Sequence, residues 1–445
     1  MEFDLVIPEE MGRSIRDSVF AVEGREGWIF GLSRVVRVGN SLRFIMVGTS
    51  SVDEEDYDCR AEAGLTLTAE ASSRFNLASV EAARFGFVPA HIHSHPAGIS
   101  DFSGHDDRVE LELHEWLRSQ GQPWLLSMVM APGHAPRARL WRNGRPCFCG
   151  LRIGLCRWRR PREESQITSA PLLALDRQRA FGPGLAQAAP LLKVGIVGTG
   201  GVGMLVAEML ARSGFTDFVL VDPDYVEDVN LNRLGHAYRR DVGRSKVNLC
   251  RSVILRACAA AGTKATVRAF CNDVNLLSKS AEKALVQCDV ILALTDDELS
   301  HIACLKFAQE NGIEYLQAGV GIFQEEGRIT TAAVEFTGAE SGRYCPICTG
   351  RLSPAQASID ARRYVGGEVT ERAHAEGYIP EEPAPSVMSL NAVAAGALVL
   401  EIQKRVAGLS RPVDLWQHDF LAGKTLFEQS IEKKLRGSCW VCGRN

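Results

Sequence analysis

The sequence predicts an α/β protein of two domains: an N-terminal α+β domain and a C-terminal domain built on a doubly wound parallel sheet. The chain has 445 residues, which is too many for one ordinary hydrophobic core. Residues 1 to about 150 alternate short apolar runs, typical of strands, with a few helical patterns. From about residue 172 the pattern becomes strand, glycine-rich loop, helix and strand, which indicates parallel strands joined by helices.

The composition is that of a soluble globular protein, with 46% hydrophobic and 23% charged residues. A net charge of −4 gives no reason to expect nucleic acid or an anionic membrane as a partner. The chain lacks both the basic start of a secretory signal and an apolar run of the ~20 residues that a membrane helix needs. Thirteen cysteines, with two CxxC pairs, suit metal binding in a reducing compartment. We therefore expect a cytoplasmic protein.

In the N-terminal part we expect a hairpin at 35–48, a helix at 106–119 and a buried strand at 123–131. Residues 156–171 are basic, then polar, and broken by prolines, which indicates a linker. Its arginines could contact a phosphate backbone, but a solvated connector is the favoured interpretation. The predicted domains are accordingly 1–155 and 172–445.

The stretch HIHSHPAGISDFSGHDD, residues 91–107, predicts a metal site. His93 and His95 are two residues apart on a predicted strand, so both imidazoles project from one face and can reach one ion. Asp106, at the expected start of a helix, adds a carboxylate. Two histidines and one carboxylate leave a fourth tetrahedral position for water, which is the catalytic arrangement of zinc. Such an ion lowers the pKa of water toward ~7 and polarises a carbonyl.

The spacing His-x-His-x7-Ser-x2-Asp resembles the JAMM (MPN+) signature of metal-dependent deubiquitinating isopeptidases. The resemblance implies an MPN domain, an α+β fold of the cytidine-deaminase-like type. It implies that His93, His95 and Asp106 bind catalytic zinc and that the Ser103 hydroxyl supports the oxyanion. The signature leaves out four neighbours, which we interpret as loop or helix-capping residues: His91, Asp101, His105 and Asp107.

In the JAMM family an upstream glutamate is the general base. Glu23, eight residues before Gly31, is near the position that the family uses, and Glu26 is the alternative. A surface loop rich in histidine and aspartate, without metal, is the competing interpretation of the whole stretch. Five residues near the family's intervals favour the metal site.

The stretch KVGIVGTGGVG, residues 193–203, predicts a nucleotide-binding loop. Its glycines let the backbone turn tightly and approach a phosphate at a helix N-terminus. They are Gly198, Gly200, Gly201 and Gly203. Asp222, nineteen residues after Gly203, ends the next apolar strand and would accept hydrogen bonds from ribose hydroxyls. This pattern alone fits NAD, FAD and ATP.

The residues that follow favour ATP. Arg233 and Lys246 are cations that hydride transfer does not need, whereas a triphosphate does. Asp296 ends the apolar run ILALTDD and is placed to hold Mg²⁺ at the carboxyl edge of the sheet. Taken singly, the two cations could be surface charges and the aspartate a helix cap.

This combination resembles the ThiF/MoeB/HesA and ubiquitin-activating adenylyltransferase family, from residue 176 to the C-terminus. The resemblance implies that the DxDxVxxxNLNR motif, the lysine thirteen residues after its arginine and a TDN-like strand end form the ATP site. It adds Asn230 to that site and implies that Arg177 is an arginine finger donated across a homodimer interface. The sequence departs from the family pattern at two places. It has TDD at 295–297 in place of TDN, and Leu234 where relatives often have glutamine.

The pairs CPIC and CWVC are about ninety residues apart and predict a closed structural zinc site, which the ThiF-like family also has. Its ligands would be Cys345, Cys348, Cys439 and Cys442. Ubiquitin-activating relatives carry a catalytic cysteine in a crossover loop, here 349–385, which contains none. The reaction would then stop at the acyl-adenylate or use another nucleophile. Ser386 could form an oxyester, although a helix N-cap is its favoured role.

Both resemblances imply one substrate, a ubiquitin-like protein with a C-terminal glycine tail. The C-terminal domain would adenylate that tail with ATP and Mg²⁺, and the zinc domain would hydrolyse peptide or isopeptide bonds after it. Such fusions resemble enzymes of bacterial ubiquitin-like conjugation pathways, several of them in antiviral defence, and a conjugating enzyme is a further expected partner. The alternatives are activation and trimming of a sulfur-carrier protein in cysteine, thiamin or molybdopterin synthesis, and a scaffold that only binds the modifier.

Overall fold

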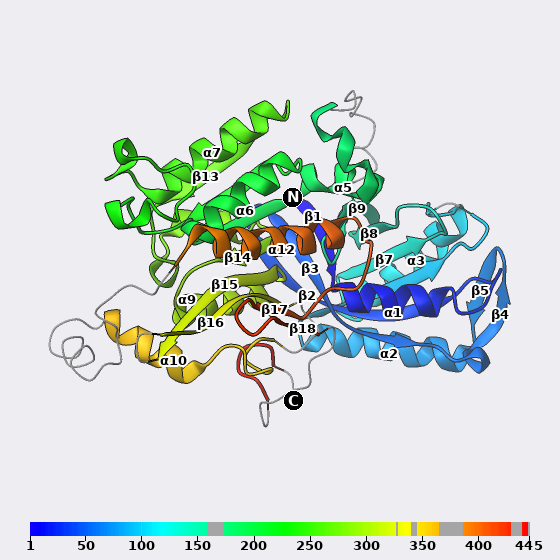
Figure 1. The fold of residues 1–445 in the computed structure, drawn as a ribbon. Coiled ribbons are helices and arrows are strands. Elements are labelled where there is room, and N and C mark those ends of the chain that lie inside the picture. Colours follow the sequence, from blue (N-terminus) through cyan, green and yellow to red (C-terminus); the bar gives the residue numbers. More distant parts are fainter. Residues whose placement is uncertain are drawn as a thin grey trace. The chain divides into compact units, whose positions relative to one another are not determined.

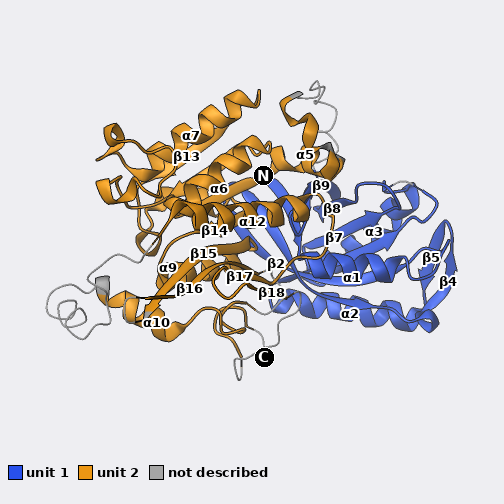
Figure 2. Ribbon diagram, viewed as in Figure 1, with its two compact units in different colours: residues 1–168 blue, residues 169–445 orange. Residues whose placement is uncertain are grey.

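The computed structural model describes residues 1–98, 100–158, 173–325, 328–339, 345–364, 386–428 and 438–443. The chain divides into two compact units, residues 1–168 and 169–445 (Figure 2). Each unit has a sheet of its own (Figure 1). Each unit also has its own hydrophobic clusters.

Unit 1 is built on a sheet that closes on itself. In the described part of the unit, seven strands form the ring in the order β1 (Glu2–Ile7), β3 (Ser41–Ser51), β2 (Trp28–Val38), β6 (Phe87–Ser94), β7 (Trp124–Met130), β8 (Arg137–Arg142) and β9 (Arg145–Ile153). The ring closes because β9 pairs in parallel with β1. A separate hairpin joins β4 (Tyr57–Ala61) to β5 (Gly64–Leu67).

Three helices accompany this sheet: α1 (Glu9–Val19), α2 (Ala69–Arg84) and α3 (Gly104–Ser119). Alternate residues of the strands pack with α1 in one core cluster. The opposite face of the sheet packs against α2 through Trp28 and Phe75, and against α3 through Leu117 and Trp141. This two-sided burial follows from the period of two in a strand, which sends successive side chains to opposite faces.

The sequence analysis predicted the α+β character of unit 1 and the hairpin at 35–48, and both are confirmed. The closure of the sheet was not predicted, because it depends on pairing between β1 and β9, about 150 residues apart. The predicted linker began too early. Residues Cys156–Trp158 form the strand β10, which pairs with β9, and Arg157 pairs with Asp4 at 3.4 Å. Residues 159–171 lie outside the described ranges.

Unit 2 has a sheet whose described strands run in the order β13 (Thr266–Phe270), β12 (Asp217–Val221), β11 (Lys193–Val197), β14 (Val290–Ala293), β15 (Glu314–Glu325), β16 (Arg328–Ala339), β17 (Leu415–Asp419) and β18 (Lys424–Glu428). Strands β13 to β15 in this order are parallel, which confirms the expected Rossmann-like core. The remaining pairings are antiparallel, so the sheet is parallel only in its first five strands.

Helices cover both faces of this sheet. α6 (Gly201–Arg212), α7 (Lys246–Ala260) and α12 (Met388–Val406) pack together on one face (Figure 1). α8 (Lys279–Leu285) and α9 (Glu298–Asn311) cover the other and contribute to its main core cluster. The central strands are fully buried, which explains their continuous apolar sequences. None of the helices in the described ranges combines the length and apolarity needed to cross a bilayer.

The turn from β11 into α6 depends on two glycines with different tasks. Gly198 has a φ of +89°, a backbone conformation that side chains disfavour. A Cβ on Gly203 would lie 2.0 Å from the carbonyl oxygen of Gly198, so the helix can approach the loop only without one. Gly200 is different, because a Cβ there would meet no atom within 4 Å.

We expect Gly203→Ala to reduce the free energy of unfolding by about 1–3 kcal/mol, because the backbone must shift to accept the methyl group. Scanning calorimetry would show this as a lower Tm. Gly200→Ala is the matched control and should melt close to the parent protein. Equal losses in the two variants would contradict this account of the turn.

Candidate functional sites

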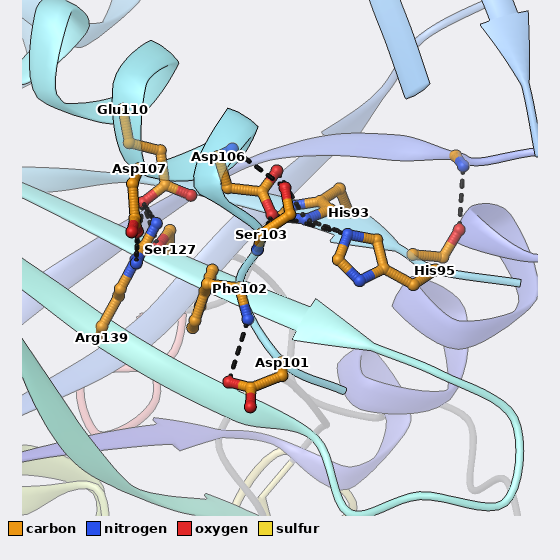
Figure 3. Close-up of polar contacts among 12 residues, drawn as sticks. His93, His95, Asp101, Phe102, Ser103, Asp106, Asp107, Glu110, Ser127 and Arg139 are labelled. Atoms are coloured by element: carbon orange, nitrogen blue, oxygen red, sulfur yellow. Dashed lines mark hydrogen bonds and ion pairs between the residues drawn. The ribbon is translucent and has the colours of Figure 1, made fainter. Parts of the chain in front are cut away.

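The predicted metal ligands of unit 1 come together at the end of β6 (Figure 3). The Nε2 atoms of His93 and His95 are 3.2 Å apart. The carboxylate oxygens of Asp106 lie 3.4 Å from His93 Nε2 and 3.6 Å from His95 Nε2. Tetrahedral zinc with nitrogen and oxygen ligands at about 2.0–2.2 Å separates neighbouring ligand atoms by about 3.3–3.6 Å. The three side chains therefore have the spacing that one zinc ion requires.

Local structure explains why these side chains meet. Ile92 points into the core cluster, so His93 projects from the opposite face of β6, toward α3. Ser103 is the N-cap of α3, and its hydroxyl oxygen accepts a hydrogen bond from the Asp106 amide at 3.2 Å. In return, the Ser103 amide donates to the Asp106 carboxylate at 2.6 Å. This capping box holds the carboxylate facing the histidines.

The charge state of Asp106 suits a cation. Burial acts to raise its pKa, but hydrogen bonds and charge from His93, together with the hydrogen bonds of Ser103, outweigh that effect. The pKa of Asp106 therefore lies well below its ordinary value, and the carboxylate is ionised. Ser103 was predicted to support an oxyanion, and the contact that the structure gives its hydroxyl oxygen is the helix cap.

A buried network that the sequence analysis missed anchors α3. Glu110, one turn after Asp106, is 5% exposed. Its Oε2 accepts hydrogen bonds from Ser127 Oγ at 2.7 Å and Arg139 Nε at 2.9 Å (Figure 3). It also accepts one from Trp141 Nε1 at 2.5 Å. Burial raises the pKa of Glu110, and Arg139 opposes it. The network ties the helix that carries Asp106 to β7 and β8. A lone glutamate in a helix gives no such signal in sequence.

The residues that the motif leaves out have other contacts. The His91 ring packs edge-on against Trp28 at 5.0 Å, and burial lowers its pKa to about 4. Asp101 pairs with Arg137 at 3.0 Å, and Asp107 with Arg139 at 2.5 Å. The two aspartates are thus ion-pair partners rather than caps.

Pairing between β2 and β6 determines which glutamate lies near the metal ligands. Trp28 is opposite His93 in this antiparallel pair. One residue further, the Gly27 amide donates to Ser94 Oγ at 2.9 Å, and the Ser94 amide donates to the Gly27 carbonyl at 3.1 Å. These bonds continue the pairing beyond the strand ends. Glu26, the next residue, is thereby brought to the His-Asp cluster.

Glu26 is buried and interacts electrostatically with His93 and Asp106. Burial raises the pKa of Glu26 to about 7, partly opposed by His93 and assisted by Asp106. Glu23, the residue favoured by counting from Gly31, lies three residues upstream and is exposed. The structure therefore places Glu26, and not Glu23, beside the cluster.

In unit 2 the glycine loop leaves β11 between the carboxyl ends of β12 and β14, at the topological switch point of the sheet. Asp222 follows β12 and is 5% exposed. The Thr199 amide donates to its Oδ2 at 2.6 Å, and the Asp224 amide donates to its Oδ1 at 2.8 Å. Burial raises the pKa of Asp222, and these two amides oppose it. Asp222 thus holds the glycine loop in place, with Thr199 as a partner that the sequence analysis missed.

Apart from Arg177, the other predicted ATP-site residues lie on the segments after β12 and β14. Asn230 is buried, and its Oδ1 accepts a hydrogen bond from the Glu227 amide at 3.1 Å. Lys246 begins α7 and pairs with Asp224 at 2.7 Å. Arg233 Nη1 donates to the Val229 carbonyl at 2.6 Å. Asp296 and Arg177 are exposed, the first just after β14 and the second in the segment Leu173–Phe181.

The start of α12 adds a residue that was not predicted. Asn391 is 2% exposed, and a Cβ on Gly201 would lie 2.2 Å from its amide nitrogen. Its side chain also meets the Ser386 hydroxyl at 3.3 Å. The expectation that Ser386 caps this helix was wrong, because the N-cap position belongs to Val387 and has no side-chain cap.

The four cysteines of the CxxC pairs form a cluster in unit 2. The Sγ atom of Cys345 is 3.8 Å from that of Cys348 and 3.7 Å from that of Cys439, and Cys348 and Cys442 are 3.5 Å apart. A zinc–sulfur distance of about 2.3 Å gives a tetrahedral edge of about 3.8 Å, whereas a disulfide needs about 2.05 Å. The cluster therefore has the dimensions of a four-thiolate zinc site.

Electrostatics also favour a cation in this cluster. A hydrogen bond with Cys442 and burial raise the pKa of the Cys345 thiol, and burial raises that of Cys348. Several thiolates in one apolar place are unstable without a compensating charge, and a divalent ion supplies it. Three of the four cysteines belong to the core cluster of unit 2, so the site is continuous with that core.

The chain shares sequence with known proteins. The model of the ThiF family matches residues 175–441. Over 61 residues the chain is 48% identical to tRNA threonylcarbamoyladenosine dehydratase of Bacillus subtilis (strain 168), covering 14% of this chain and 24% of that protein. Over 142 residues it is 30% identical to ubiquitin-like modifier-activating enzyme 5 of Drosophila virilis, covering 31% and 35%. The chain thus spans about a quarter to a third of the length of these relatives.

Solved structures resemble the chain only loosely. The crystal structure of E. coli MccB with ATP is 19% identical, with a TM-score of 0.47 over 61% of this chain and 74% of that one. Another MccB structure, with AMPCPP and MccA, is 14% identical, with a TM-score of 0.48 over 93% and 99%. These identities and TM-scores are too low to indicate a shared function.

We expect the purified protein to hold two zinc ions per chain, measured by plasma mass spectrometry. Cys439→Ser should remove one ion and lower the Tm, because a thiolate site contributes folding free energy. His95→Ala should remove the other. Cys271→Ser, at an exposed cysteine, is the control and should keep both. Full zinc content in either site variant would show that its cluster does not bind the ion.

Proposed function

Because the chain belongs to the ThiF family, we propose that unit 2 is an ATP-dependent adenylyltransferase that activates the C-terminal carboxylate of a ubiquitin-like protein. The observation that carries the proposal is the polar arrangement at the switch point of the sheet. There the open glycine loop, Asp222 and Lys246 surround the N-terminus of α6. The name of one relative, ubiquitin-like modifier-activating enzyme 5, supports this choice of substrate.

The residues of this site divide the work of binding ATP. The N-terminus of α6 has no side-chain cap, so its free amides can bind phosphate beside Gly200. Asp222, held by Thr199, accepts the ribose hydroxyls. Lys246 now pairs with Asp224 and can turn to the phosphates, with Arg233 as a second cation. Asn230 stabilises the turn that carries Arg233.

The reaction needs the substrate carboxylate to attack the α-phosphorus of ATP. A bond forms between a carboxylate oxygen and that phosphorus, the bond to the bridging oxygen breaks, and pyrophosphate leaves. Lys246 and Arg233 stabilise the negative charge that grows on the leaving group. Mg²⁺, when bound at Asp296, would neutralise part of the same charge. Arg177, donated by a second copy in a homodimer, adds a further cation.

The product is passed on as an acyl-adenylate. Residues 349–385 contain no cysteine that could form a thioester. Ser386 has its oxygen engaged by Asn391, which does not favour an oxyester. The acyl group would then go to an external acceptor, such as a conjugating enzyme or a sulfur donor. The second acceptor gives the alternative function, in which the substrate is a sulfur-carrier protein of cysteine, thiamin or molybdopterin synthesis.

Pyrophosphate exchange into ATP, measured with a ubiquitin-like protein that ends in a glycine tail, tests the activation step. Lys246→Ala and Asp296→Ala should each reduce exchange at least ~100-fold, since each removes charge stabilisation from the transition state. Lys306→Ala, at an exposed lysine of α9 paired with Glu310, is the control and should exchange normally. Undiminished exchange in both site variants would contradict the proposed adenylation activity of unit 2.

We propose that unit 1 is a zinc-dependent peptidase or isopeptidase of the JAMM type that cleaves after the same glycine tail. The ThiF match begins at residue 175, so this second proposal depends on the residues of unit 1 alone. The observation that favours it is the spacing of the three ligands together with a buried glutamate of raised pKa beside them. Its role would be to process a precursor or to release the modifier from targets.

The residues of unit 1 can carry out the proton transfers of amide hydrolysis. A bound zinc ion would make a water more acidic and polarise the scissile carbonyl. Glu26 takes a proton from the attacking water and passes it to the leaving amine, and a pKa near 7 suits both steps. The Ser103 hydroxyl, whose oxygen caps α3, would donate its proton in a hydrogen bond to the oxyanion. The ligands that would hold the ion are His93, His95 and Asp106.

Glu26→Gln should reduce cleavage of a tail-extended precursor by about 10²–10⁴-fold, because it removes the general base. Zinc content should stay at the parent level, which separates this role from metal binding. Glu23→Gln is the matched control three residues away and should cleave normally. If Glu23→Gln loses activity and Glu26→Gln keeps it, the assignment of the base is wrong.

A further inference from the structure

A basic hollow lies in unit 2 between α6, α7 and the segment 236–240. Its volume is about 640 Å³. Four arginines line it: Arg212, Arg239, Arg240 and Arg256. None of the residues assigned to the ATP site lines this hollow.

The hollow is well removed from the glycine loop along the same two helices. Glu208, on its wall, is seven residues after Gly201, which corresponds to about 10 Å along α6. Arg256 is ten residues after Lys246, or about 15 Å along α7. The N-terminal ends of the helices belong to the ATP site, and their C-terminal halves form the walls of the hollow.

The arginines carry an excess of positive charge. Arg212 pairs with Glu208 at 2.8 Å, whereas the other three have no acidic partner within ion-pair distance in the described part of the chain. A position in the last turn of α6 accounts for Arg212, because a cation there is stabilised by the helix dipole. It does not account for Arg256, which precedes the last turn of α7. Nor does it account for Arg239 and Arg240, which belong to the short 3-10 helix Arg239–Asp241 and line the same space.

A strained residue holds one wall of the hollow. His236 has a φ of +65°, and in the described residues only one other non-glycine residue, Asn143, has a positive φ. Such a backbone costs about 1 kcal/mol or more and persists only when the surroundings hold it. The His236 ring meets Glu208 Oε2 at 2.6 Å. Burial acts to raise the pKa of Glu208, but His236 and Arg212 outweigh it and lower the pKa.

We propose that this hollow binds a small organic phosphate with at least two negative charges, at a site separate from the ATP site. Guanidinium groups bind phosphate through paired hydrogen bonds, and several converge here. The volume lies within the range of about 300–1,000 Å³ typical of small-molecule sites. Val253, Ala257 and the Tyr238 ring provide apolar surface for the organic part of the ligand.

Calorimetric titration of the full chain tests this site, in an Arg233→Ala/Lys246→Ala background that weakens phosphate binding at the ATP site. The probes are ADP, GDP, fructose 1,6-bisphosphate and inorganic pyrophosphate. We expect saturable binding of at least one organic probe at one site per chain. Arg239→Ala/Arg256→Ala should weaken it at least ~100-fold, since two charge-assisted contacts are lost.

Arg251→Ala is the matched control, because this arginine is on α7, is exposed and does not line the hollow. It should bind like the background protein, and thermal melting should show that all variants are folded. Binding that survives in Arg239→Ala/Arg256→Ala would overturn the proposal. So would the absence of saturable binding for every organic probe, or binding of pyrophosphate alone.

Discussion

Both candidate sites depend on the same constraint, a crossover helix between two parallel, adjacent strands. In unit 1, β6 leads through α3 to its parallel neighbour β7, and in unit 2, β11 leads through α6 to β12. A parallel pair cannot be joined by a tight turn, so the helix must start at the carboxyl end of the first strand. The loop before it therefore brings strand-end side chains to the unpaired amides of a helix N-terminus.

The two crossover helices differ in how their N-terminal amides are capped. In α3 the capping box satisfies the amides of Ser103 and Asp106, and it leaves the Asp106 carboxylate facing two histidines. The result is a cluster suited to a cation. In α6 the N-cap is Gly200, with no side-chain cap and open space around it. Its amides remain available to an anion, which agrees with the phosphate-binding role proposed for unit 2.

Unit 2 has two further polar features, a four-cysteine cluster suited to a cation and an arginine-lined hollow suited to an anion. The four-cysteine cluster joins segments 94 residues apart, so a bound ion would close a long loop and add stability as well as local order. The arginine-lined hollow uses the far ends of the two helices that start at the ATP site. The same pair of packed helices would thus carry both sites that we propose for negatively charged groups.

Short-range spacing in the sequence was sufficient to predict three of the side-chain clusters and the core of unit 2. The alternation of His93 and His95, the glycine loop and the CxxC pairs predicted three clusters, because each depends on periodicity or on a few neighbouring residues. The Rossmann-like core followed from the same kind of pattern. Departures at the linker and at Ser386 arose where capping and strand pairing, rather than composition, decide the end of an element.

Only the tertiary structure decided features that depend on contacts between distant segments. Glu26, and not Glu23, lies beside the His-Asp cluster because hydrogen bonds between Ser94 and Gly27 align the segment before β2 with the end of β6. The number of residues between Glu23 and Gly31 does not reveal this alignment. Glu110 looks like a surface residue in sequence, yet strands β7 and β8 bury its carboxylate. The closed sheet requires β1 to pair with β9, and the basic hollow requires α6, α7 and the segment 236–240 to meet. In each case the determining interaction spans a sequence separation that local patterns do not encode.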